Sequence, residues 1–101
     1  MITLSKLQRQ QVIDHLFTHN GTQYNMHKAS EELTELALVL TQKILKPNKV
    51  LEKEIIDEIG DVIIRLEVLK RMYSRKKIME RINYKLNKYK GYIINKTYNK
   101  F

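Results

Sequence analysis

Residues 31–64 read EELTELALVLTQKILKPNKVLEKEIIDEIGDVII, and this stretch decides the fold. Its apolar residues recur every three or four positions, which is the period of an α-helix, and no alternating strand pattern interrupts them. Pro47 cannot continue a helix, whereas Asn48 can cap the helix that follows. We therefore expect two antiparallel helices, at about residues 25–45 and 49–73, joined by a short link.

The sequence before this pair predicts a first helix. Apolar residues from Leu4 to Phe17 keep the helical period until His19-Asn20-Gly21, which is a helix stop signal. At 101 residues the chain has the length of one domain with one core. We expect a single all-α domain over residues 1–101, a four-helix, bundle-like arrangement.

A fourth helix, rich in basic residues, is predicted at about residues 75–90, ending before Gly91. Its apolar positions share one face, which we expect to point inward: Ile78, Ile82, Leu86 and Tyr89. The tail at 91–101 has no clear period, so we expect it to be mobile or packed on a partner.

Two segments of the central helices are apolar on more than one side. They are residues 36–40, LALVL, and residues 62–64, VII. A helix that is apolar nearly all round must be covered on several sides, which a small four-helix monomer does poorly. We expect a homodimer or homotetramer; the alternative is that these are simply the two central helices of a monomer.

Charge is unevenly distributed along the chain, whose net charge is +8. From Lys70 onward there are eleven Lys or Arg residues against Glu80 alone, whereas residues 31–67 hold nine acids and five bases. No segment is long and apolar enough to span a membrane, no signal peptide is evident, and cysteine is absent. We expect a cytoplasmic protein, with any metal bound through oxygen or histidine.

Four carboxylates form two pairs with helical spacing, Glu32 with Glu35 and Glu58 with Asp61. Residues three apart lie on the same side of a helix, so each pair presents oxygens in one direction. If the helices around Pro47 are antiparallel, the two pairs can face each other, and a cation would neutralise their repulsion. An all-oxygen site suits Mg²⁺ or Mn²⁺.

Other interpretations of the acidic residues stay open. Acids on amphipathic helices are often solvated and ion-paired with neighbours, which would leave the four carboxylates without a metal. Glu31 and Glu54 are near enough to support the site or orient water, but each is equally well explained as surface. Asp57 is expected to be surface.

The segments Glu31-Glu32-Leu33-Thr34-Glu35 and Glu58-Ile59-Gly60-Asp61 resemble the E-E-x-x-E and E-x-x-D signature of the MazG-like nucleotide pyrophosphohydrolases. The resemblance covers about residues 21–91 and is to the short single-domain members often carried by phages. It implies the all-α nucleoside triphosphate pyrophosphatase fold. It also implies that the protein acts in the cytoplasm of a bacterial or phage-infected host cell. It further implies that Mg²⁺ is held by Glu32, Glu35, Glu58 and Asp61, with help from Glu31, and that a nucleoside triphosphate is cleaved to monophosphate and pyrophosphate.

Basic residues of the fourth helix are candidates for binding the phosphates of the substrate. Lys85 falls within the apolar stripe and needs a partner, and Arg81 and Lys88 lie one turn on either side. Lys28, one turn before Glu32, is a weaker candidate. The alternative for Lys85 is that its side chain extends past the core to solvent.

Two further functions and the choice of base stay open. A basic helical protein could bind nucleic acid or act as a regulator without catalysis, although the resemblance makes nucleic acid an unlikely partner. A member that kept the fold and lost catalysis is the other possibility. There is no tryptophan to stack on a base, and the sequence does not choose among Phe17, Tyr24, His27 and Tyr73.

Overall fold

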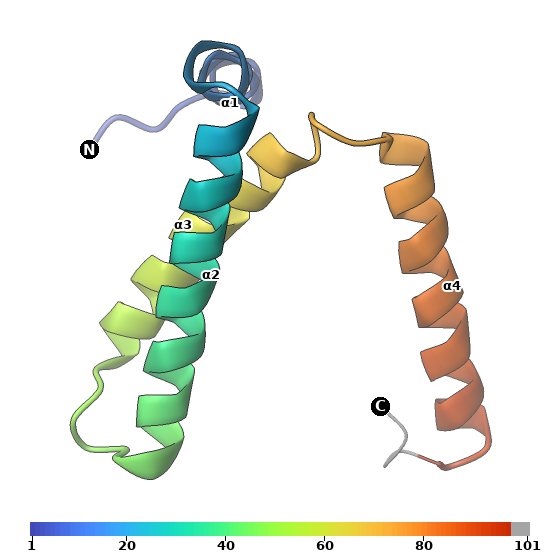
Figure 1. The fold of residues 1–101 in the computed structure, drawn as a ribbon. Coiled ribbons are helices and arrows are strands. Elements are labelled where there is room, and N and C mark those ends of the chain that lie inside the picture. The colour runs from blue at the N-terminus through green and yellow to red at the C-terminus, as the bar shows by residue number, and fades with distance from the viewer. Residues whose placement is uncertain (98–101) are drawn as a thin grey trace.

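The computed structural model describes residues 1–97, and within them every regular element is helical. The four elements, drawn in Figure 1, are α1 (Lys6–Asn20), α2 (Thr22–Leu45), α3 (Glu52–Leu69) and α4 (Arg75–Ile94). This confirms the predicted all-α class and the four helices. No helix among the described residues is both long enough and apolar enough to cross a membrane.

The two ends of α1 follow from local side-chain chemistry. The Ser5 hydroxyl accepts from the Gln8 backbone N–H at 3.1 Å, and the Gln8 side chain accepts from the Ser5 N–H at 2.8 Å, forming a capping box. At the other end, Gly21 has φ of 81° in the left-handed region, which glycine adopts without steric cost. The predicted stop at Gly21 is confirmed, and α2 starts directly after it, at Thr22 instead of near residue 25.

The link between α2 and α3 is longer than predicted. The Lys43 ammonium donates to the carbonyls of Pro47 at 2.9 Å and Val50 at 3.0 Å, which fixes the turn. Consequently α3 begins at Glu52, not at residue 49, and the predicted cap by Asn48 is wrong. The free N–H of Leu51 instead donates to the Glu54 carboxylate at 3.3 Å.

The C-terminal limits of α3 and α4 also differ from the prediction. After Leu69 the N–H groups of Arg71 and Met72 bond to carbonyls three residues back, so α3 ends in a tight turn and does not reach Tyr73. In contrast, α4 runs through Gly91 to Ile94, so the predicted stop before Gly91 is wrong. Residues 92–94 of the predicted tail are therefore helical, and residues 98–101 lie outside the described residues.

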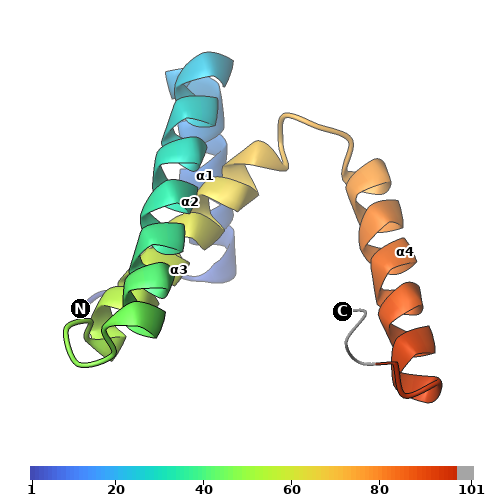
Figure 2. The same ribbon diagram turned by 60° about the horizontal axis from the view of Figure 1, so that its bottom comes forward.

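The core is small and lies where α2 packs on α3, with α1 against both, as the rotated view in Figure 2 shows. Its buried apolar residues are Ala29, Val50, Val62 and Val68. Asn25 is also buried, and its side-chain amide donates to the Leu16 carbonyl at 3.2 Å, joining the end of α1 to α2. The Arg71 guanidinium, only 12% exposed, donates to Asp14 at 2.6 Å and ties α1 to the end of α3.

Helix α4 stands apart from the other three helices (Figure 1). Within the described part of the chain it makes no helix-to-helix contact with α1, α2 or α3. The face that was predicted to point inward is therefore not covered by those helices, and Ile82 and Leu86 on it are 42% and 59% exposed.

Replacing Asn25 by alanine is predicted to weaken the junction of α1 and α2. It removes the buried donor to the Leu16 carbonyl, a loss of about 1–3 kcal/mol in the free energy of unfolding. Urea unfolding followed by circular dichroism, at one protein concentration, measures the change. Gln23→Ala, at an exposed position of the same helical turn, is the control. Equal stability of the two variants would contradict the role given to Asn25.

Candidate metal centre

Three carboxylates from two helices converge at the middle of the α2–α3 pair. One oxygen each of Glu32, Glu58 and Asp61 lie within 4.8 Å of one another. Glu32 and Glu58 are half-buried and Asp61 is exposed. The packing of α2 on α3 produces this cluster, because it brings one side of each helix together. The predicted facing of the two acidic pairs is thus observed for three of the four residues.

The carboxylates of this cluster are partly desolvated, repel one another and leave two oxygens without a hydrogen-bond partner. Burial raises the pKa of the Glu32 carboxyl, and the neighbouring charges of Glu35 and Asp61 raise it further. The Oε2 atoms of Glu32 and Glu58 are buried and have no hydrogen-bond partner. Buried acceptors without a partner are unfavourable, and a bound cation would satisfy both oxygens at once.

Glu35 and Glu31 lie at the edge of the cluster. Glu35 is exposed, and a hydrogen bond between its carboxylate and the Glu32 carboxyl contributes to the raised pKa of Glu32. Glu31 adds a smaller repulsion to Glu32 and is itself ion-paired with Lys28 at 3.4 Å. Both residues are therefore placed to join or support a metal site.

The remaining acids of this region have local structural roles. Glu54 accepts from the Leu51 N–H at the start of α3, so it caps the helix. Asp57 pairs with Lys53 at 2.6 Å, and both side chains are mostly exposed. Neither residue belongs to the carboxylate cluster of the described chain.

The basic residues proposed to bind phosphate fall into two groups. Lys28 is on α2 beside Glu31, one turn before Glu32. The three α4 residues are not brought to the acids within one chain, because α4 contacts none of the other helices. They lie instead over aromatic rings of their own helix, with Arg81 5.2 Å from the centre of the Tyr84 ring and Lys85 5.0 Å from that of Tyr89. Lys88 lies over Tyr92 at 6.0 Å. Their phosphate role stays a prediction.

Arg65 is a residue near the acids that the sequence reasoning missed. It follows Asp61 by four positions and Glu58 by seven, so it shares their side of α3. Its Nη1 atom is buried without a hydrogen-bond partner. Its spacing of seven residues from Glu58 could have indicated that it lies on the acidic side of α3. The spacing alone is weak evidence, because an arginine in an amphipathic helix is usually solvated.

The donor set suits a hard divalent cation. Carboxylate oxygens are the protein ligands that Mg²⁺ and Mn²⁺ prefer, and these carboxylates come from rigid helices. No histidine takes part in the described cluster, and the chain has no cysteine, which disfavours softer metals. The residues therefore fit Mg²⁺ chemically.

Comparisons with protein-family models, with curated proteins and with solved structures found no match for this chain. The site is an acidic cluster with two buried, unpartnered oxygens and a raised pKa.

Mg²⁺ is predicted to stabilise the protein through the cluster. A ligand that binds only the folded state at a hundred times its dissociation constant stabilises it by about 2.7 kcal/mol. Thermal unfolding with increasing Mg²⁺ measures this shift. Glu32→Gln is expected to abolish it, whereas Asp57→Asn, which removes an exposed acid of α3, is expected to keep it. A similar Mg²⁺ response in all three proteins would contradict a specific site.

The raised pKa of Glu32 predicts how metal-free stability changes with pH. The folded protein holds this proton more tightly than the unfolded chain, so the free energy of unfolding falls as pH rises through the raised pKa. Relative to Glu32→Gln, the wild type should lose stability over this window without metal. Saturating Mg²⁺ should reverse the trend, because the metal binds the deprotonated carboxylate. Urea unfolding across this pH range checks both signs.

Proposed function

We propose that this chain is a Mg²⁺-dependent nucleotide pyrophosphohydrolase. It would cleave a ribo- or deoxyribonucleoside triphosphate between the α and β phosphates, giving the monophosphate and pyrophosphate. The observation that carries the proposal is the cluster of Glu32, Glu58 and Asp61, with its two buried and unpartnered oxygens. The resemblance of its two acidic motifs to the MazG-like pattern supports the same reaction.

The chain's own residues have distinct parts in this proposal. Glu32, Glu35, Glu58 and Asp61 hold the metal, which supplies neutralisation of phosphate charge. Glu31, beside Glu32, assists the site. Half-burial of Glu32 and Glu58 excludes water from one side of the cluster and strengthens every electrostatic interaction there. Without the metal, the four carboxylates would repel a negatively charged triphosphate.

Cations near the site would bind the outer phosphates. Lys28 is half-buried, with 31% of its side chain exposed, and can exchange its pairing with Glu31 for a phosphate oxygen. Arg81, Lys85 and Lys88 lie along one edge of α4 and would act where α4 meets an acidic hairpin in an assembly. Nucleoside triphosphates occur in the cytoplasm, which is where we propose the protein acts.

The charge of α4 favours a second candidate function. This helix carries seven Lys or Arg residues and one acid, Glu80, and it stands clear of α1–α3. A nucleic-acid-binding or regulatory protein would use such a helix on phosphate backbones. Binding of that kind weakens steeply with added salt and needs no divalent ion, which separates it from the enzyme.

A screen of nucleoside triphosphates with and without Mg²⁺ tests the enzyme proposal by the release of pyrophosphate. Asp61→Asn and Glu35→Gln are expected to lower kcat/KM by at least about 100-fold, since even the outer partners of a metal site contribute 10- to 100-fold. Asp57→Asn, with its exposed carboxylate, should retain activity. If the wild type turns over no nucleotide with Mg²⁺ or Mn²⁺, the proposed activity is wrong.

A further inference from the structure

The single chain exposes far more surface than a folded monomer of its size. Its accessible surface is 8439 Å², whereas about 6,000 Å² is usual for 12 kDa. Its radius of gyration is 17.0 Å, against about 13 Å for a compact chain of this length. The excess, on the order of 2,400 Å² per copy, is the area that an obligate protein interface buries.

One part of this excess is the apolar face of α4. Ile78, Ile82, Leu86 and Ile93 follow the helical period on this face, and the last three are 42–59% exposed. None of α1–α3 contacts the helix within the described residues. Helices in proteins gain most of their stability from packing an amphipathic face, which α4 does not do within one chain.

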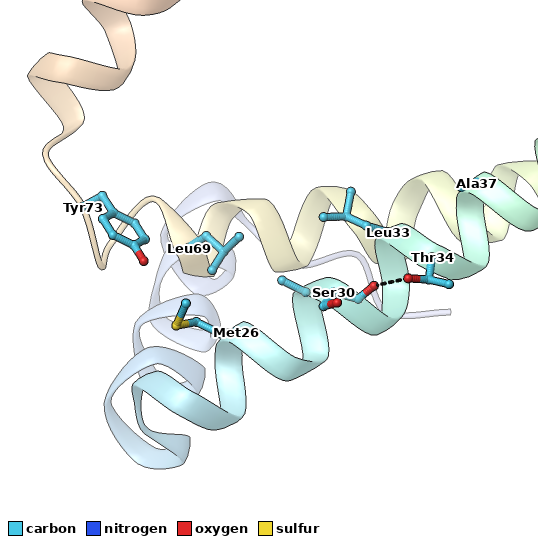
Figure 3. Close-up of a pocket in the computed structure, with 8 residues that line it drawn as sticks. Met26, Ser30, Leu33, Thr34, Ala37, Leu69 and Tyr73 are labelled. Carbon is cyan, nitrogen blue, oxygen red and sulfur yellow. Dashed lines mark hydrogen bonds between the residues drawn. The ribbon is translucent and has the colours of Figure 1, made fainter.

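The other part is an apolar groove along α2, shown in Figure 3. It has a volume of about 520 Å³ and is bordered at one end by Leu69 and Tyr73, the residues that precede α4. Its remaining lining residues are Met26, Ala29, Ser30, Leu33, Thr34 and Ala37. Exposed apolar residues extend the same stripe of α2 to Leu40 and Ile44.

Two threonine hydroxyls on this side of α2 need no hydrogen-bond partner from an occupant of the groove. The Thr34 hydroxyl donates to the Ser30 carbonyl at 2.8 Å, as Figure 3 shows, and the Thr41 hydroxyl donates to the Ala37 carbonyl at 2.9 Å. Both hydroxyls are thus satisfied within α2. Losing the water above them costs little, so an apolar helix is a suitable occupant.

Length and charge match α4 to the hairpin. The stripe from Met26 to Ile44 spans about 27 Å and α4 about 30 Å, at 1.5 Å per residue. The hairpin region, residues 31–67, has nine acids and five bases, whereas α4 has seven bases and one acid. The opposite net charges of the hairpin and α4, together with apolar surfaces of similar length, favour their association.

We propose that a second copy of this chain supplies the occupant, with α4 of each protomer packed along the α2 groove of the other. The chain's own α4 is directed away from the groove and contacts none of α1–α3 (Figure 1). Reciprocal exchange is self-complementary, so it closes as a two-fold dimer. The apolar face of α4 and the α2 groove are then buried in both protomers.

Single-cysteine variants test this exchange, because the chain has no cysteine of its own. Thr34→Cys on the groove is mixed, under mild oxidation, with a mass-tagged copy carrying Met79→Cys, Ile82→Cys or Leu86→Cys on α4. At least one mixture should give covalent heterodimers, and Tyr84→Cys on the opposite face of α4 should not. Heterodimers from none of the three would overturn the proposal, as would dimers formed only by Thr34→Cys with itself.

Sedimentation gives an independent readout that needs neither metal nor activity. The wild type is expected to be a dimer at micromolar concentration, and Ile82→Asp to weaken the dimer by at least 100-fold. Tyr84→Asp makes the same kind of change on the opposite face and should leave the dimer intact. A wild type that sediments as a monomer at 100-fold higher concentration would overturn the exchange and the phosphate role of α4, but not the proposed metal site, which lies within one chain.

Discussion

The antiparallel packing of α2 on α3 is the constraint from which the rest of the structure follows. This pair makes the most extensive helix contact among the described residues, and Ala29 of α2 and Val62 of α3 are almost fully buried. Lys43 fixes the turn through two carbonyls and thereby sets the register of the pair. This register decides which acids of α2 meet which acids of α3.

The same packing creates a conflict between stability and chemistry. Acids at the flank of a helix interface lose hydration and repel one another, as the raised pKa of Glu32 shows. A core of a few small residues does little to offset that repulsion. The cation and the second copy that we propose would each offset part of this cost, the first at the acids and the second along α2. Functional sites commonly break local folding rules in this way.

Periodicity predicted the parts of this structure that depend on short-range geometry. The helical class, the end of α1 at Gly21 and the meeting of Glu32 with Glu58 and Asp61 all follow from spacing and one turn. The start of α3 did not, because Lys43 holds the link through the carbonyls of Pro47 and Val50 and the helix begins only after Leu51. The position of α4 depends on long-range packing, which no local pattern encodes, and it is the element that prediction placed least well.

The helical hairpin also restricts how this sequence can vary. Each residue inserted into a helix rotates everything beyond it by about 100°. An insertion of one residue in α2 between Glu35 and the turn would rotate Glu32 out of the interface with α3, even though all the acids remain in the sequence. Insertions in residues 46–51 carry no such rotation as long as the helices keep their register. The position of each residue around its helix therefore constrains the sequence as strictly as its identity does, and in the link the two carbonyls bound by Lys43 limit the change in length.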